Sequence, residues 1–211
     1  MIRVLLVDDH AVVRTGFRLL LQSQKDIQVV AEAASGEQAC QLYSELAPDV
    51  VVMDLGMPGM GGLEALRRIR ARDPEAHILA LSAHDDPMHA RRALREGALG
   101  FLSKRSAPET LIDAIAAIAS ARRYIDTSIA QKLALADIEG VSRSPLEQLS
   151  EREFEVFLRL AAGATVQKIA EDLKLSASTI GTHLYNIKQK LGVVNQSELT
   201  LLAIRHGLME A

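Results

Sequence analysis

The sequence predicts an α/β domain built around a parallel sheet, followed by a smaller all-helical domain. Between residues 1 and 120, five short apolar runs alternate with segments of helical periodicity, as expected when strands and crossover helices follow one another in a covered parallel sheet. Residues 147–211 carry helical periodicity alone. The segment between them, residues 121–146, ends in a stretch with Gly, Ser and Pro that is typical of a linker.

The apolar runs and their breaks place each element of the first domain. Strands are predicted near residues 2–7, 27–33, 49–53, 77–82 and 99–102. Helices are predicted near residues 11–23, 37–46, 62–72, 87–96 and 107–119. Pro48, Asp73-Pro74 and Gly97 mark boundaries between these elements. Five strands in the flavodoxin-like order 2-1-3-4-5 would place the first and third strands side by side.

The third strand carries the residue around which the first domain is organised. Val50 to Met53 are apolar without polar alternation, which suits a strand buried on both faces, and the run ends on Asp54 before a Gly/Pro loop. Ligands of open parallel sheets bind at the carboxyl ends of the strands, which is where Asp54 would lie. For a lone Asp in this position, N-capping of the next segment would be the simpler interpretation.

Asp54 is not the only polar residue at a predicted strand end. The first strand ends on Asp8-Asp9, the fourth on Ser82, and Lys104 lies just past the fifth. Neighbouring carboxylates repel one another and raise each other's pKa unless a cation neutralises them, and an all-oxygen cluster suits Mg²⁺. His10, beside the acidic pair, has no spaced His or Cys partner, so we interpret it as structural rather than as a ligand of a transition metal.

Composition bounds the class of protein. The single cysteine, Cys40, excludes an internal disulfide framework and fits the reducing cytosol, so we expect a cytoplasmic protein. No segment has 18 apolar residues without charge, and the first residues lead directly into a strand, so we expect no membrane partner. The net charge of −3 by itself favours no nucleic-acid partner.

Four helices are predicted in the second domain. They lie near residues 151–162, 166–173, 177–191 and 196–206, and residues 127–136 have the pattern of a further short helix within the linker. Ser150 and Glu153 have the spacing of a capping box. The short break at residues 174–176 is typical of the tight turn in a helix-turn-helix.

The third of these helices has an apolar stripe on one face and a polar face opposite. The polar face, with the turn before it, offers hydroxyls, amides and lysines that suit contacts with double-stranded DNA. An ordinary solvated helix face would look similar, but between Asp172 and Glu198 the chain has three lysines and no acid, as phosphate contacts require. The candidate DNA-binding residues are Lys174, Ser178, Thr179, Gly181, Thr182, Tyr185, Asn186, Lys188 and Gln189.

Three lysines provide modest affinity, so we expect a homodimer on a two-part DNA site. The last predicted helix offers Leu199, Leu202 and Ala203 as an apolar stripe. This stripe could face either a second copy of the chain or the core of its own domain.

The constellation Asp8, Asp9, Asp54, Ser82 and Lys104 resembles the receiver domain of two-component response regulators over residues 1–120. The segments Leu149–Glu153, Ile169-Ala170, Leu175-Ser176, Thr179-Ile180 and Lys190–Val193 are similar to the LuxR-type DNA-binding domain. The two together resemble the NarL/FixJ family, and residues 57–65 and 198–207 resemble its GacA/UvrY group. Gly181 and Tyr185 depart from the basic or long polar residues of relatives, so the target DNA sequence does not carry over.

The resemblance implies a phosphorylation-controlled transcriptional regulator. Asp54 would accept a phosphoryl group from a sensor histidine kinase or phosphotransfer protein, with Mg²⁺ held by Asp9, Asp54 and the backbone carbonyl of Gly56, and by Asp8 through water. Lys104 would pair with the phosphoryl group, Ser82 would move toward it, and Phe101 would follow, although Phe101 also fits plain core packing. The domain would catalyse only its own phosphorylation and slow dephosphorylation, and the phosphorylated chain would bind DNA as a homodimer.

Two other classes of function have to be weighed against this one. An aspartyl-phosphate phosphatase also uses a strand-end Asp and Mg²⁺, but it usually has a second catalytic Asp two residues later, where this chain has Gly56. A phosphorylation-dependent protein-binding module with a degenerate DNA-binding domain is the other alternative. Loss of DNA retention with intact phosphorylation would favour it.

Overall fold

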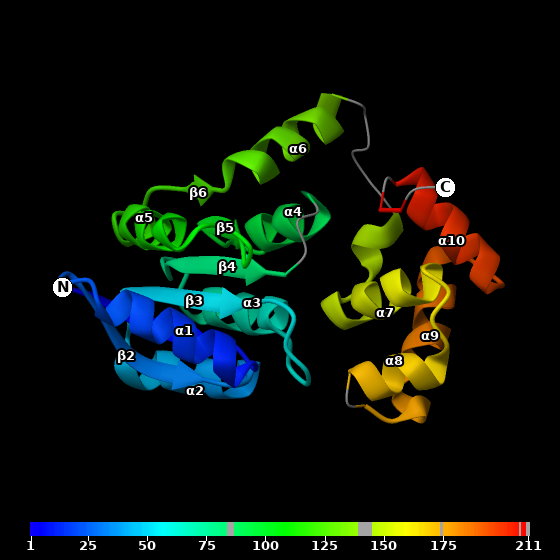
Figure 1. Ribbon diagram of the computed structural model, residues 1–211, viewed down its shortest axis with the longest axis horizontal. Helices are drawn as coiled ribbons and strands as arrows, with labels where there is room; N and C mark the ends of the chain where they lie inside the picture. Colours follow the sequence, from blue (N-terminus) through cyan, green and yellow to red (C-terminus); the bar gives the residue numbers. More distant parts are fainter. Residues whose placement is uncertain (84–86, 139–144, 174, 207, 210–211) are drawn as a thin grey trace. The chain divides into compact units, whose positions relative to one another are not determined.

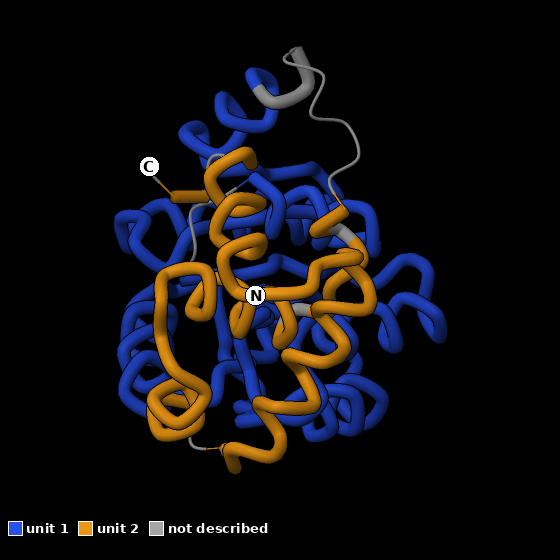
Figure 2. Tube along the Cα trace, turned by 90° about the vertical axis from the view of Figure 1, so that its right-hand side faces the viewer, with its two compact units in different colours: residues 1–135 blue, residues 136–211 orange. Residues whose placement is uncertain are grey.

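The computed structural model describes residues 1–83, 87–138, 145–173, 175–206 and 208–209. The chain forms two compact units, Met1–Leu135 and Ala136–Ala211 (Figure 2). None of the helices among the described residues is long and apolar enough to cross a membrane.

The first unit is built on a parallel sheet of six strands in the order β2-β1-β3-β4-β5-β6 (Figure 1). The strands are β1 (Ile2–Val7), β2 (Ile27–Ala33), β3 (Val50–Asp54), β4 (Ile78–Ser82), β5 (Gly100–Ser103) and β6 (Tyr124–Ile125). The first five, and their order, confirm the prediction from the sequence. The short strand β6 was not predicted, because two residues are too few to show a strand pattern.

Strand β6 pairs with β5 through Gly100 and Tyr124. A Cβ at Gly100 would lie 2.5 Å from the carbonyl oxygen of Tyr124 and 2.7 Å from Cδ1 of Ile118. Only glycine therefore allows the backbone of β6 and the side chain of Ile118 to approach β5 this closely.

Helices cover both faces of the sheet, as the continuous apolar strands predict. Helices α1 (Ala11–Gln22) and α5 (Pro108–Ala119) pack on the face where Val4 and Leu6 of β1 lie. Helices α2 (Gly36–Leu46), α3 (Gly62–Arg72) and α4 (Pro87–Arg95) pack on the other face. Because successive side chains of a strand point to opposite faces, β1 is buried from Val4 to Val7 on both sides.

The first compact unit continues past residue 120, where we placed the end of the first domain. Helix α6 (Thr127–Ile138) begins after Asp126, whose carboxylate accepts hydrogen bonds from the Ser128 backbone N–H at 2.9 Å and the Ser106 hydroxyl at 2.8 Å. Ile129 is fully buried in the same apolar cluster as Phe101. Part of the segment interpreted as linker, including Ile125, Ile129 and Leu133, is thus packed on the first unit.

Among its described residues from 145 onward, the second unit has a short 3₁₀ turn (Pro145–Gln148) and four helices, which confirms the predicted all-helical domain. The helices are α7 (Glu151–Ala161), α8 (Val166–Asp172), α9 (Ala177–Leu191) and α10 (Gln196–Arg205). Each begins at a side chain that caps its N-terminus: Ser150, with the complete capping box to Glu153, and then Thr165, Ser176 and Asn195.

The apolar stripe of α10 faces the core of the second unit. Leu199 and Ala203 are fully buried and Leu202 is partly buried, while Leu201 on the opposite side is 53% exposed. Of the two roles left open for this stripe, the structure shows the packing role for Leu199 and Ala203. The role of the stripe in a dimer stays a prediction, and Leu202 is the member of the stripe that keeps accessible surface.

Candidate functional site

Three charged side chains meet at the carboxyl edge of the sheet. Asp8 follows β1, Asp54 is the last residue of β3, and Lys104 follows β5. The backbone continues the sheet's hydrogen bonding here: the Asp8 N–H donates to the Ala33 carbonyl at 3.1 Å and the Lys104 N–H to the Ser82 carbonyl at 2.8 Å. Parallel strands that end together therefore bring residues 8, 54 and 104 to one place.

Lys104 bridges the two buried carboxylates. Its Nζ lies 2.6 Å from Asp8 Oδ2 and 2.8 Å from Asp54 Oδ2. Both carboxylate side chains are almost completely buried, at 0% and 3% exposure. One ammonium thus stands between two acids that would otherwise repel each other in a poorly solvated place.

The electrostatics of Asp54 reflect this burial. Desolvation raises the pKa of Asp54 to about 6, against the attraction of Lys104 and with added repulsion from Asp8. Burial opposes the charged form of Lys104 as well, but the two carboxylates outweigh it and raise the Lys104 pKa above its ordinary value. A further cation at this edge would favour the ionised form of Asp54.

The loop after Asp54 is held tightly. The Gly56 N–H donates to Asp54 Oδ1 at 3.1 Å, and the Gly62 N–H donates to the Leu55 carbonyl at 3.3 Å. A Cβ at Gly62 would lie 1.9 Å from the Asp54 carbonyl oxygen, so the start of α3 packs directly on the end of β3. Glycine at this position allows the close packing that fixes the Asp54 backbone.

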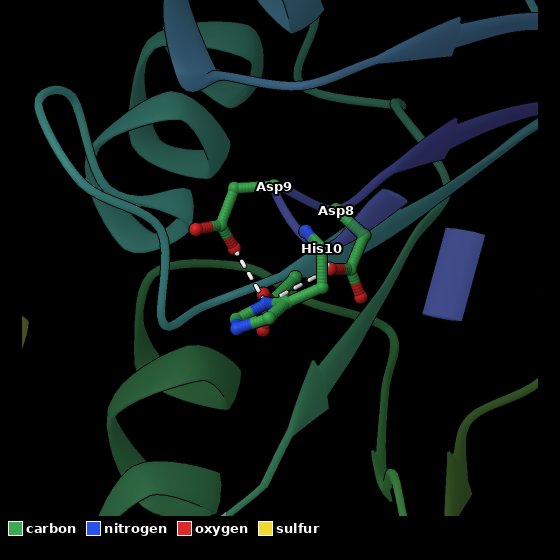
Figure 3. Close-up of side chains that lie close together, drawn as sticks. Asp8, Asp9 and His10 are labelled. Carbon is green, nitrogen blue, oxygen red and sulfur yellow. Dashed lines mark hydrogen bonds and ion pairs between the residues drawn. The ribbon is translucent and has the colours of Figure 1, made fainter. Parts of the chain in front are cut away.

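Asp9 and His10 lie beside the buried carboxylates, on the side of the site nearer the protein surface. His10 Nδ1 is 2.9 Å from Asp9 Oδ1 and 3.4 Å from Asp8 Oδ1 (Figure 3). The His10 backbone N–H donates to Asp8 Oδ1 at 2.8 Å. The His10 side chain is 65% exposed, so it borders the acidic cluster at the surface instead of packing in the core.

The donor set can accept a divalent cation. Oxygen atoms of Asp8, Asp9 and Asp54, with a nitrogen of His10, lie within 4.8 Å of one another. Carboxylate oxygens are the ligands that Mg²⁺ prefers, and this acidic cluster fits it. Mg²⁺ itself and the Gly56 carbonyl ligand remain predictions.

Ser82 and Phe101 lie at the ends of the neighbouring strands. Ser82 closes β4 and is 2% exposed, and Phe101 is fully buried in β5, paired with Ala80. The packing interpretation of Phe101 holds in this state. The movement predicted for the two residues stays a prediction.

The polar face of α9 is exposed, as the helical periodicity predicts. Ser178, Thr182 and Gln189 are exposed, and the Tyr185 side chain is 64% exposed, while Ile180 and Ile187 are buried on the opposite face. Among the remaining candidates, Thr179 is exposed, Gly181 and Asn186 are half-buried, and Lys174 lies outside the described residues.

Two of the lysines contact other parts of the domain. Lys188 Nζ donates to the Val194 carbonyl at 2.8 Å, and Lys190 Nζ donates to Glu153 Oε2 at 2.5 Å. The pairing of Lys190 with Glu153 was not predicted from the sequence. The pair joins α9 to the capping box of α7, residues 37 positions apart, so sequence spacing carries no signal for it.

Comparisons with known proteins agree with both halves of this description. The family of response regulator receiver domains matches residues 4–116, and that of bacterial regulatory proteins of the luxR family matches residues 147–203. The chain belongs to the response regulators of the LuxR family. Its receiver domain contains the Asp8, Asp54 and Lys104 cluster, and its DNA-binding domain contains α9.

The relatives of this response regulator match along its whole length. It is 44% identical to the response regulator UvrY of Escherichia coli strain K12, over 100% of this chain and 97% of that protein. It is 41% identical to the response regulator GacA of Pseudomonas viridiflava, over 100% and 99%. Among solved structures, RcsB of Salmonella enterica serovar Typhimurium, bound to the promoter rprA with the phosphomimetic BeF₃⁻, matches with a TM-score of 0.63 at 27% identity, over 95% and 97% of the two chains.

Proposed function

We propose that Asp54 is the phosphoacceptor of this response regulator and that its phosphorylation switches DNA binding by α9. The observation that carries this proposal is Lys104, which lies 2.8 Å from the buried Asp54 carboxylate and 2.6 Å from Asp8. The phosphoryl donor would be a sensor histidine kinase or a phosphotransfer protein, in keeping with the receiver family.

Asp54 has the properties of a nucleophile for phosphoryl transfer. A carboxylate oxygen of Asp54 attacks the phosphorus atom of a phosphohistidine, and the bond from phosphorus to the imidazole nitrogen breaks. The pKa of about 6 leaves Asp54 largely ionised at neutral pH. Lys104, already beside Asp54, stays in reach of the transferred oxygens and stabilises their negative charge.

Asp8, Asp9, Asp54 and the backbone carbonyl of Gly56 would hold Mg²⁺. When bound, this ion would neutralise charge on the phosphoryl oxygens. Ser82, at the end of the adjacent strand β4, would donate its hydroxyl to a phosphoryl oxygen, and Phe101 would move toward the space that Ser82 leaves. The chain catalyses its own phosphorylation and dephosphorylation and is not a turnover enzyme.

In the DNA-binding domain, we propose that α9 enters the major groove with its exposed face. Tyr185, Thr182 and Ser178 would contact bases, with Gly181 allowing close approach of the backbone, and Lys188 and Lys174 would contact phosphates. The solved RcsB structure with a promoter supports this use of the domain. The phosphorylated chain would act as a homodimer, and a regulator of bacterial promoters would work in the cytoplasm.

The test is phosphorylation of the full-length chain by acetyl phosphate with Mg²⁺, read by the mass of the protein. The wild type should gain one phosphoryl group and Asp54→Asn should gain none. Asp113→Asn, on the exposed side of α5, is the control and should be labelled normally. Labelling of Asp54→Asn at the wild-type level would disprove the assignment.

A further inference from the structure

Arg14, in the second turn of α1, makes two hydrogen bonds that connect the acidic pair to strand β2. Its Nη1 donates to the backbone carbonyl oxygen of Asp8 at 2.6 Å, and its Nε donates to Glu32 Oε2 at 3.0 Å. The side chain is 19% exposed, so it is largely fixed against the protein. The planar guanidinium can make both bonds at once because its donors point along a rigid fork.

The Asp8 carbonyl, which Arg14 contacts, lies just beyond the end of strand β1. Strand β1 ends at Val7, so the next residue, Asp8, follows the last ladder pair of β1. Asp8 is fully buried, and a buried carbonyl needs a donor. Arg14 supplies that donor and thereby fixes the peptide unit between Asp8 and Asp9.

The orientation of this peptide unit decides where both acidic side chains point. On one side of it, Asp8 directs its carboxylate to Lys104; on the other, Asp9 directs its carboxylate to His10. If this peptide rotated, the oxygens of the acidic cluster would separate.

We propose that Arg14 is a positioning residue for the receiver site: it holds the Asp8–Asp9 peptide in the orientation that places both carboxylates for a divalent cation. Glu32 anchors the guanidinium from β2. The inference rests on the proposed phosphorylation site, and it adds a residue that contacts neither the phosphoryl group nor the cation.

The same helix provides a matched control. Arg18, one turn further along α1, has its Nε 3.1 Å from the other oxygen of the same carboxylate, Glu32 Oε1. In the part of the chain that the structure describes, Arg18 pairs with Glu32 and not with Asp8. Arg14→Gln and Arg18→Gln remove the same charge from the same helix face, but only the first releases the Asp8 carbonyl.

For the replacement of Arg14, loss of its charge and loss of its positioning role predict opposite changes in Mg²⁺ affinity. Removing a positive charge near three carboxylates would by itself strengthen Mg²⁺ binding. Loss of positioning would weaken it, and the loss of a residue that orients metal ligands typically costs about 10-fold in affinity or more. The sign of the change therefore identifies the role of Arg14.

The experiment measures Mg²⁺ affinity of the full-length chain by calorimetry and amide hydrogen exchange of residues 8–14 without metal. We expect Arg14→Gln to bind Mg²⁺ about 10-fold more weakly than the wild type, and its metal-free exchange to be roughly 5- to 10-fold faster. Arg18→Gln should keep wild-type exchange and bind Mg²⁺ at least as tightly. If Arg14→Gln does not fold, Arg14→Lys replaces it, because lysine keeps the charge but lacks the planar guanidinium. We expect weaker Mg²⁺ binding and faster exchange for this variant as well.

The results separate this inference from the proposed function. Equal exchange and equal Mg²⁺ affinity in the Arg14 and Arg18 variants would overturn the positioning role while leaving the site intact. Tighter Mg²⁺ binding by Arg14→Gln would overturn it as well. Absence of Mg²⁺ binding and of phosphorylation in the wild type would overturn the proposed function, and this inference with it.

Discussion

At the scale of single residues, the site stores unfavourable electrostatic free energy in the metal-free state. Asp54 and Asp8 are buried together, and one lysine has to compensate for both. A folded chain tolerates this arrangement because the packed sheet ends hold the three side chains in place. Binding of a cation at the proposed site would relieve this repulsion.

Replacement of Asp54 by Asn should stabilise the metal-free protein at neutral pH. The pKa of Asp54 is higher in the folded chain than its ordinary value of 3.8, so its ionised form is disfavoured by folding. This penalty is absent below about pH 4, grows between pH 4 and pH 6, and is fully present above. We expect a gain of about 2 to 3 kcal/mol at pH 7 and almost none at pH 3.5.

Urea denaturation of both proteins in EDTA at the two pH values measures this difference. Asp113→Asn, exposed on α5, controls for the loss of a charge as such. A difference between wild type and Asp54→Asn that does not change with pH would contradict the explanation by burial.

Replacement of Lys104 by Met should destabilise the metal-free protein and increase its response to Mg²⁺. The substitution leaves Asp8 and Asp54 buried without their shared cation, which costs roughly 3 kcal/mol. Millimolar Mg²⁺ should recover part of the loss, because binding to the folded state alone stabilises it. Mg²⁺ should raise the melting temperature of Lys104→Met more than that of the wild type or of the control Lys25→Met, whose lysine is exposed. An equal increase in all three proteins would show that Lys104 and the cation act at different places.

At the scale of elements, most helices begin and end where short-range chemistry dictates. The capping box Ser150/Glu153 and the N-caps Ser176 and Asn195 start α7, α9 and α10. Gly192 ends α9 with a φ of 66°, in the left-handed region that favours glycine. Within α9, Gly181 is an interior glycine, and a Cβ added to it would meet nothing within 4 Å.

Replacement of Gly181 by Ala should stabilise the DNA-binding domain and weaken DNA binding. Alanine favours the helix by about 1 kcal/mol over glycine, and the structure has room for it. If α9 lies in the major groove, the added methyl group would restrict the approach of its backbone to the bases. Urea denaturation measures the stability, and gel retention of a promoter fragment measures the DNA affinity. Higher stability with unchanged DNA affinity would show that this face of α9 does not approach the bases closely.

At the scale of the whole molecule, phosphorylation of Asp54 as proposed would have to be transmitted to a separate compact unit. Helix α6 is a candidate for the transmission, because it is anchored to the receiver by Asp126 and by Ile129 next to the Phe101 cluster. The predicted Ser82 and Phe101 movement would therefore reach the segment that leads to the second unit.

A fragment from about residue 146 onward should bind target DNA without any phosphoryl donor, if the unphosphorylated receiver restrains the DNA-binding domain. Its helices form a compact unit with their own buried core. Within the fragment, Thr182→Ala or Tyr185→Ala should reduce discrimination between sites. Lys188→Ala should weaken all sites alike and lower the salt slope by about 1.

Gel retention against genomic fragments, with and without acetyl phosphate for the full-length chain, measures these effects. If the fragment binds DNA no better than the unphosphorylated full-length chain, the receiver does not inhibit DNA binding. Phosphorylation would then act by pairing receivers.

The order of residues along the chain determined the architecture of this response regulator and the set of residues at its sheet edge. Continuous apolar strands that end on Asp8, Asp54, Ser82 and Lys104 require a parallel sheet, and in such a sheet the strand ends meet. The helical periods of the second domain likewise predicted which face of α9 would be exposed. These features depend on local spacing, which a sequence displays directly.

Only the tertiary structure decided the features that depend on contacts between distant segments. It showed that Leu199 and Ala203 of α10 are buried in their own domain, that residues 124–125 add a sixth strand, and that α6 as far as Leu135 belongs to the first unit. It also brought Lys104 to two carboxylates at once and Arg14 to the Asp8 carbonyl. Such contacts are set by packing in three dimensions, and the spacing of residues along the chain carries no record of them.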